Sequence, residues 1–201
     1  MANYDVLIFD LVGVLVEGSD VTTKAMLKAT GMTDDEMWNF WINSSTVRDF
    51  DSGRISSRDF GERLVEDLKL PLEVDEFLDL FRGWIAGLYD GTEAMLGKLS
   101  SAYRLACFSN INEIMWPLIR DHHGMGGLLD EYFLSYKMGM LKPDGDAFEY
   151  VLSELKVAPE RIAFFDDLEV NVRTAQQAGM HAFVTKGLPA LENELQRLGI
   201  L

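Results

Sequence analysis

The chain reads VLIFDLVGVL over residues 6–15, and this stretch decides the fold. Four apolar residues precede Asp10, and Gly13 follows three residues later. A short, wholly apolar run of this kind predicts a strand that is buried on both faces of a parallel sheet. Asp10 would then lie just beyond the carboxyl end of the strand, which is where open α/β sheets bind their ligands.

Similar apolar runs recur in the rest of the chain, with segments of helical period between and after them. The further apolar runs cover residues 105–108, 132–134, 162–165 and 182–184. The helical segments cover residues 93–102, 111–121, 146–155, 170–178 and 191–198. This alternation predicts an α/β fold with a doubly wound parallel sheet. Gly179 is placed to end its helix in a left-handed cap.

The segment of residues 17–88 breaks the alternation, because it shows helical patterns and no convincing strand. Thr33 and Glu36 form a capping-box pattern that opens one helix, Ser56 or Ser57 caps a second, and residues 74–88 form a third. We therefore predict an α/β core domain of residues 1–16 and 89–201. A helical cap domain of residues 17–88 is inserted after the first strand and covers the carboxyl edge of the sheet.

Composition limits the partners and the compartment. The 201 residues carry 18 Lys and Arg against 33 Asp and Glu, a formal net charge of −15. Such a field repels phosphate backbones and anionic lipid, so neither nucleic acid nor a membrane is expected as a partner. The single cysteine, Cys107, allows no internal disulfide, and no targeting or membrane-spanning segment is apparent, which indicates the cytoplasm. Whether the protein is a monomer or a homodimer stays open.

Polar side chains follow the later strands as well. In chain order they are Ser109 and Asn110, Lys142, Asp166 and Asp167, with Asn171 four residues further on. Because the carboxyl ends of parallel strands meet at one edge of a sheet, we expect these groups to lie near Asp10. Clustered carboxylates suit Mg²⁺, and a lysine and a hydroxyl suit a phosphoryl group. Asp10 could then attack phosphorus to give an aspartyl-phosphate that water later cleaves.

In this order the four segments resemble the four motifs of the haloacid dehalogenase superfamily. The intervening sequences GRIS (residues 53–56) and SNIN (residues 109–112) are most similar to the branch that contains α-glucose-1-phosphate phosphatases. The resemblance implies these roles: Asp10 as nucleophile acting with Lys142; Ser109, Asn110 and Lys142 as phosphate ligands; Asp10, the Val12 carbonyl, Asp166 and Asp167 as Mg²⁺ ligands; and Asn171 as a supporting residue. The expected substrate is a small phosphorylated metabolite, with a sugar phosphate as one candidate.

Val12 departs from the superfamily pattern, because most of its phosphatases carry an acid–base aspartate at this position. A catalytically weak or inactive protein that binds a ligand or partner is therefore an alternative. A 2-haloacid dehalogenase is another, since halide leaves without a proton. Asp166 and Asp167 disfavour the dehalogenase, because uncompensated carboxylates beside Asp10 call for a cation. The branch that this chain resembles also commonly lacks the aspartate, so a phosphatase remains the main interpretation.

Substrate specificity is expected to come from the cap domain. The candidate specificity residues are Glu17, Arg48, Asp49 and Arg54. Trp38, Trp41 and Trp84 are predicted to form the core of the cap.

Overall fold

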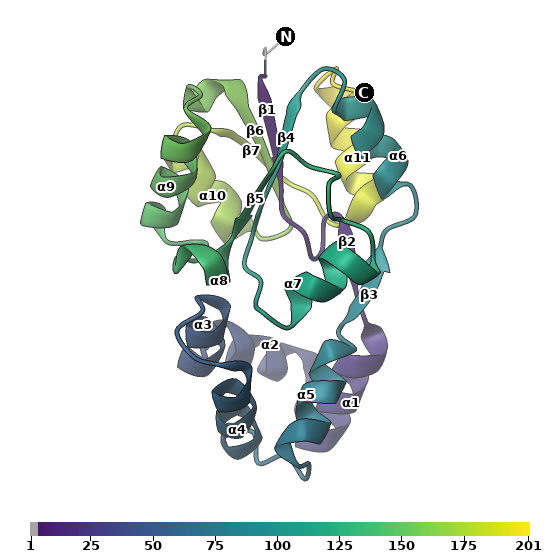
Figure 1. Cartoon of the computed structure of the whole chain (residues 1–201), viewed down its shortest axis with the longest axis vertical. Coiled ribbons are helices and arrows are strands. Elements are labelled where there is room, and N and C mark those ends of the chain that lie inside the picture. The colour runs from purple at the N-terminus through teal and green to yellow at the C-terminus, as the bar shows by residue number, and fades with distance from the viewer. Residues whose placement is uncertain (1–3) are drawn as a thin grey trace.

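The structure, a computed structural model, describes residues 4–201, which form two lobes (Figure 1). The larger lobe contains a five-stranded sheet in the order β5-β4-β1-β6-β7. Its strands are β1 (Val6–Phe9), β4 (Arg104–Ser109), β5 (Glu131–Leu134), β6 (Ile162–Asp166) and β7 (His181–Val184). All neighbouring pairs run parallel. The fold class predicted from the sequence is confirmed.

Helices cover both faces of this sheet (Figure 1). They are α9 (Gly145–Leu155) and α10 (Glu169–Gln177) on one face, and α6 (Thr92–Leu99) and α11 (Gly187–Arg197) on the other. Val6 and Ile8 of β1 pack on the first face, whereas Leu7 and Phe9 pack on the second. All four are fully buried, which explains the uninterrupted apolar run. Cys107 in β4 is also fully buried, as expected for a packing residue.

The region after β4 differs from the predicted helix over residues 111–121. A short helix, α7 (Met115–Pro117), leads into a π-helical turn, η1 (Leu118–His122). The side chain of Asn112 accepts hydrogen bonds from the backbone N–H groups of Ile114 and Met115, so it caps the helix there and delays its start. Two further short segments are α8 (Ser135–Met138) and the 3₁₀ turn η2 (Pro159–Arg161).

Glycine ends α10 as predicted. Gly179 has a φ of +91° and donates its N–H to the carbonyl of Gln176, while Met180 donates to the carbonyl of Ala175. These two bonds form a Schellman motif, which satisfies carbonyl groups that the end of the helix leaves free. The turn directs the chain into β7.

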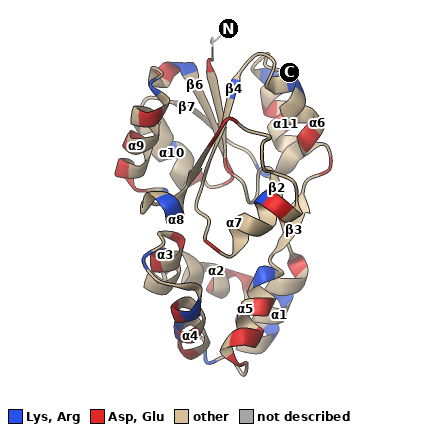
Figure 2. Cartoon of the chain, in the orientation of Figure 1, with Lys and Arg blue, Asp and Glu red and all other residues tan. Residues whose placement is uncertain are grey.

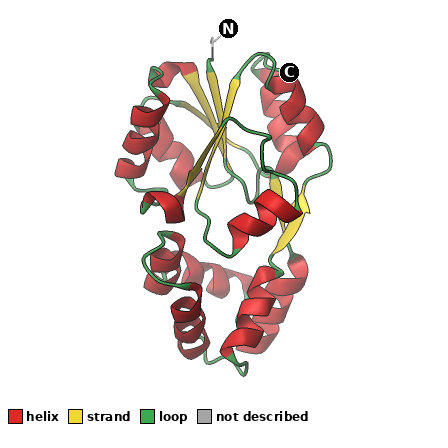
Figure 3. Ribbon diagram, viewed as in Figure 1, coloured by secondary structure: helices red, strands yellow, loops and turns green. Residues whose placement is uncertain are grey.

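The smaller lobe is helical and is joined to the sheet by a two-stranded ribbon (Figure 3). Its helices are α1 (Asp20–Thr30), α2 (Asp34–Asn43), α3 (Ser45–Asp51), α4 (Ser57–Asp67) and α5 (Val74–Arg82). Thr33 with Glu36 opens α2 by a capping box, and Ser56 caps α4, both as predicted.

Two expectations for this segment are wrong, because a ribbon of two strands lies within it. β2 (Val16–Gly18) pairs antiparallel with β3 (Ile85–Leu88), and α5 ends at Arg82 rather than continuing to residue 88. The strands escape sequence analysis because they are short, contain glycine and show no apolar alternation. The ribbon forms both connections between the lobes.

Stacked aromatic rings form the core of the smaller lobe. The ring centroids of Phe50 and Phe60 are 4.1 Å apart, and those of Phe60 and Phe81 are 5.0 Å apart. Trp41 and Trp84 join this cluster, with their centroids 4.9 Å apart, as predicted. Trp38 does not, because it is 51% exposed on α2.

Both signs of charge are spread over the helices of the two lobes (Figure 2). The acidic excess therefore does not come from one continuous acidic helix. Among residues 4–201, no helix has the length and apolar character needed to cross a membrane.

Replacing Phe60 by alanine should destabilise the protein strongly, since this fully buried ring contacts several others. Loss of a buried phenylalanine typically costs about 3–5 kcal/mol. Trp38→Ala is the matched control, because it removes a larger but exposed ring and should change stability by less than about 1 kcal/mol. Urea unfolding followed by far-UV circular dichroism measures both. Equal losses in the two variants would contradict the assignment of the core.

Candidate active site

The register of the sheet brings the predicted site residues to one edge. Phe9 pairs with Cys107 of β4 on one side and with Phe165 of β6 on the other. The Asp10 N–H donates to the carbonyl of Phe165 at 2.8 Å, which extends the pairing by one residue. Asp166 ends β6 in register with Asp10, and Ser109 ends β4 one residue further along. The expected meeting of strand-end residues is therefore observed.

Lys142 occupies the centre of this edge. Its Nζ lies 3.1 Å from Asp10 Oδ1 and 2.6 Å from Asp166 Oδ2, and its side chain is 1% exposed. The rings of Phe108 and Phe164 lie beneath the ammonium, at 5.4 and 5.5 Å from their centroids. Burial alone would lower the pKa of Lys142, but the two carboxylates outweigh it and raise that pKa. The lysine is therefore a fixed positive charge.

Asp166 holds the lysine in place. Its Oδ2 accepts from Lys142, while its Oδ1 accepts from the Leu168 N–H and from Asn171 Nδ2, each at 2.9 Å. Both oxygens are thus engaged by the protein, and the residue is fully buried. Asn171 thus orients Asp166, and its supporting role in the reaction stays a prediction.

Three carboxylates gather beside the lysine and could hold a metal ion. One oxygen from each of Asp10, Asp166 and Asp167 lies within 4.8 Å of the others. Burial raises the pKa of Asp10, with Lys142 opposing and Asp166 adding to the shift. Burial, followed by the charges of Asp10 and Asp166, raises the pKa of Asp167 to about 7. Three carboxylates face a single ammonium, so the site carries more negative than positive charge. This arrangement fits Mg²⁺, a hard cation that prefers oxygen ligands.

Gly13 allows the loop after β1 to lie against Asp167. Its φ is +90°, and a Cβ at this position would come 2.8 Å from Asp167 Oδ2. The Gly187 N–H donates to the Gly13 carbonyl at 2.7 Å and fixes the loop from the other side. Val12, in the same loop, is partly buried against the larger apolar cluster, and its side chain cannot transfer a proton. The role of its carbonyl as a metal ligand stays a prediction.

Asn110 and Ser109 differ in what they contact. The Asn110 amide donates to the Lys142 carbonyl at 2.8 Å and accepts the Lys142 N–H at 2.9 Å. This pair of bonds fixes the loop that carries the lysine and engages both ends of the amide, so the predicted contact of Asn110 with phosphate stays untested. Ser109 is buried, and its hydroxyl acts with Lys142 to favour the charged form of Asp10.

The candidate specificity residues in the smaller lobe are largely paired. Arg48 forms an ion pair with Asp144, which follows the Lys142 loop. Asp49 pairs with Arg54 at 3.4 Å and with Arg63 at 3.8 Å, both within the smaller lobe. Glu17 is exposed on β2.

Sequence reasoning missed a contact between the lobes. Asn112 Nδ2 donates to Asp51 Oδ1 at 2.9 Å, and joins the loop after β4 to the end of α3. Burial raises the pKa of Asp51 to about 6, although the hydrogen bond from Asn112 opposes this shift. Asparagine favours the cap of a helix over its interior, so Asn112 was a visible sign that the helix predicted over residues 111–121 begins later. No comparable signal marked Asp51.

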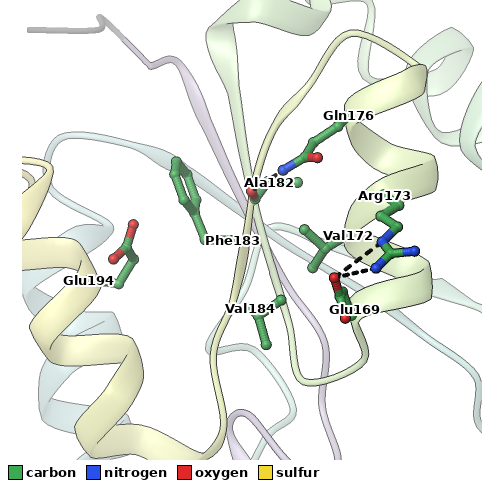
Figure 4. A pocket seen from close by; sticks show the side chains of 8 residues that line it. All are labelled: Glu169, Val172, Arg173, Gln176, Ala182, Phe183, Val184 and Glu194. Carbon is green, nitrogen blue, oxygen red and sulfur yellow. Dashed lines mark hydrogen bonds and ion pairs between the residues drawn. The ribbon is translucent and has the colours of Figure 1, made fainter.

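A groove of about 370 Å³ lies away from this site, beside the edge strand β7 and between α10 and α11 (Figure 4). Its polar side chains are already paired: Arg173 with Glu169, and Gln176 Nε2 with the Ala182 carbonyl at 2.9 Å. It contains none of the predicted site residues, so we assign it no role in the chemistry.

Fold and site together define a hydrolase of the haloacid dehalogenase type. The sequence matches the family of haloacid dehalogenase-like hydrolases over residues 4–179, and the protein belongs to this family.

Three relatives extend this result. The chain is 24% identical to D-ribitol-5-phosphate phosphatase of Bacteroides thetaiotaomicron over 88% of its own length and 89% of the relative's. It is 29% identical to sesquiterpene phosphatase astK of Aspergillus oryzae, covering 89% of this chain and 88% of that one. A solved enzyme of the same family from B. thetaiotaomicron, in complex with magnesium and inorganic phosphate, superposes with a TM-score of 0.76 at 22% identity, covering 92% and 95% of the two chains.

Binding of Mg²⁺ should weaken as pH falls below 7. With its pKa raised to about 7, Asp167 is mostly protonated below that pH, and the metal must displace the proton. The apparent affinity should fall by up to about tenfold per pH unit. Calorimetry at pH 6 in two buffers of different ionisation enthalpy counts the released protons, and Asp167→Asn should lose most of that release. Equal affinities at pH 6 and pH 8 would contradict the assignment.

Proposed function

We propose that the protein is a Mg²⁺-dependent phosphatase that hydrolyses a small phosphorylated metabolite through an aspartyl-phosphate at Asp10. The observation that carries this proposal is the geometry of the sheet edge, where Lys142 lies 3.1 Å from Asp10 and Asp167 adds a further carboxylate. The phosphatase names of two relatives support it, as does a related structure with magnesium and phosphate. A sugar phosphate remains one candidate for the substrate.

Each residue has a defined part in this reaction. The Asp10 carboxylate attacks phosphorus, and a new P–O bond forms while the P–O bond to the ester oxygen breaks. The leaving oxygen then takes a proton from solvent, because Val12 offers none. Water then attacks the phosphoryl group, which releases phosphate and regenerates Asp10. Lys142 and Ser109 hold the phosphoryl oxygens, and the contacts of Asp166 and Asn110 keep the lysine in position. These contacts orient the reacting groups before the reaction begins.

The metal completes the charge balance of the site. Asp10 and Asp167 would hold Mg²⁺ together with the Val12 carbonyl, and Asp166 adds negative charge from the side of the lysine. When bound, the ion supplies positive charge to the phosphoryl oxygens and so favours attack by an anion.

We further propose that residues 17–88 act as a cap over the sheet edge. The smaller lobe lies at the carboxyl ends of the strands (Figure 1), where a substrate would enter. A closed cap excludes water, which strengthens the electrostatic interactions inside the site.

Two other functions remain to be separated from this one. Family membership does not distinguish a phosphatase from a haloacid dehalogenase, because both use the aspartate that corresponds to Asp10. The carboxylate of Asp167 favours the phosphatase, since its charge is useful only with a cation. Val12 favours an inactive binding protein, because it removes the usual acid–base group.

Asp10→Asn should abolish hydrolysis of p-nitrophenyl phosphate while the fold is retained, because a carboxamide is a far poorer nucleophile. Excess chelator should abolish wild-type activity, and Mg²⁺ should restore it. Asp146→Asn, which neutralises an exposed carboxylate on α9, serves as control and should leave the rate unchanged. Full activity in chelator, or turnover of 2-chloropropionate without metal, would reject the phosphatase proposal.

Val12→Asp should make the rate less sensitive to the basicity of the leaving group. The wild-type protein has no acid at this position, so aryl phosphates and sugar 1-phosphates should react faster than primary alkyl phosphates. A correctly positioned general acid typically raises the rate roughly 10²–10⁴-fold, and this gain in rate should be largest for poor leaving groups. The measurement is kcat/KM against leaving-group pKa at saturating Mg²⁺, with Val12→Asn as isosteric control. Identical slopes in all three proteins would show that another group already supplies the proton.

A further inference from the structure

Helix α3 of the smaller lobe lies against the two loops that carry the phosphate-binding groups. One loop follows Ser109 and leads to Asn112, and the other carries Lys142 and leads to Asp144. Arg48 and Asp51 are three residues apart on α3 and therefore share one side of the helix. Arg48 pairs with Asp144, and Asp51 accepts a hydrogen bond from Asn112.

The link between Asp51 and Asn112 fixes the first loop. Asn112 is 2% exposed, and its Oδ1 accepts the N–H groups of Ile114 and Met115 at 3.3 and 3.1 Å. Its Nδ2 donates to Asp51 at 2.9 Å, so both ends of the amide are engaged. Only one orientation of the amide satisfies all three partners. The Asp51 carboxylate in the smaller lobe therefore fixes the orientation of Asn112, and with it the loop that follows β4.

Backbone contacts around Asp51 support the same docking point. Ser135 Oγ lies 2.6 Å from the Asp51 carbonyl oxygen and accepts the Ile111 N–H at 2.9 Å. Gly53 has a φ of +70°, and a Cβ there would come 2.4 Å from the Tyr136 carbonyl oxygen. Glycine therefore permits an approach of the two backbones that a larger residue would prevent.

The two links differ in the energy they can contribute. The side chains of Arg48 and Asp144 are 46% and 40% exposed, and exposed ion pairs contribute little. The bond between Asp51 and Asn112 involves a buried amide, and leaving a buried donor unpaired is costly. The docking of α3 on the loop after β4 therefore depends mainly on Asp51.

We propose that Asp51 is a positioning residue: through Asn112, it fixes the loop that follows Ser109 whenever the smaller lobe lies on the sheet edge. The docking stands on the contacts alone, and its effect on catalysis rests on the proposed phosphatase function. Closure of the lobe and the arrangement of the phosphate site are thus coupled by one side chain, the carboxylate of Asp51.

Exchange of backbone amide hydrogens measures how firmly α3 is docked on the loop after β4, and it requires no enzymatic activity. Asp51→Ala should increase exchange of the Ile114 and Met115 amides, because Asn112 loses the partner that fixes its orientation. Asp51→Asn should behave like the wild type, since the new amide can accept the same hydrogen bond. The control is Asp67→Ala, which removes the acceptor of the 3.3 Å bond from Thr46 of α3 but lies within the smaller lobe. Its exchange at Ile114 and Met115 should be unchanged.

Kinetics on p-nitrophenyl phosphate with saturating Mg²⁺ measure the coupling. In Asp51→Ala, kcat/KM should fall roughly ten- to hundredfold, the factor that corresponds to a buried hydrogen-bond donor left without its partner. Most of the change should appear in KM, because phosphate binding depends on the Ser109 loop. Asp51→Asn should restore the rate, and Asp67→Ala should not change it.

The outcomes separate the two proposals. Wild-type protein that hydrolyses no phosphate ester would reject the phosphatase function, while exchange would still test the docking. Unchanged exchange and kinetics in Asp51→Ala would overturn the role of Asp51, and so would an Asp51→Asn variant as impaired as Asp51→Ala. Should Asp51→Ala fail to fold, Asp51→Ser also lacks the reach to Asn112 and is expected to give the same changes.

Discussion

The arrangement of the sheet edge depends on one buried charge, the ammonium of Lys142. An unpaired charge in the interior costs several kcal/mol, so the fold must supply counter-charges at fixed positions. Asp10 and Asp166 do so from neighbouring strands, and Asn110 holds the lysine loop by its backbone. The carboxylate of Asp10 is thereby kept near a positive charge. The same requirement explains why both oxygens of Asp166 are engaged by the protein.

Most of the sheet could be predicted from the sequence, because a strand buried on both faces needs an uninterrupted apolar run. The five strands and their shared edge follow from this rule. The ribbon of β2 and β3 could not be predicted in the same way, since its exposed residues and glycines carry no periodic signal. The late start of α7 was missed because it depends on the bonds that the Asn112 side chain accepts from Ile114 and Met115.

The residue types of the site were also predictable, whereas the partner of each side chain was not. Asn110 was expected to bind phosphate, yet its side-chain amide forms two hydrogen bonds with the backbone of Lys142. Asp166 was expected to bind metal, yet both of its oxygens accept protein donors. Such choices depend on how loops distant in sequence approach one another. Asp51 is the extreme case, since its partner lies 61 residues further along the chain.

The strand order also has a consequence for how the molecule assembles during synthesis. β1 is made before its partners, so one of its edges stays unpaired until β4 has emerged at Arg104, and the other until β6 has emerged at Ile162. The helices of the inserted lobe pack against near neighbours in sequence, as α3, α4 and α5 do. Local contacts form faster than distant ones. The inserted lobe is therefore expected to fold while β1 still lacks its partners in the sheet.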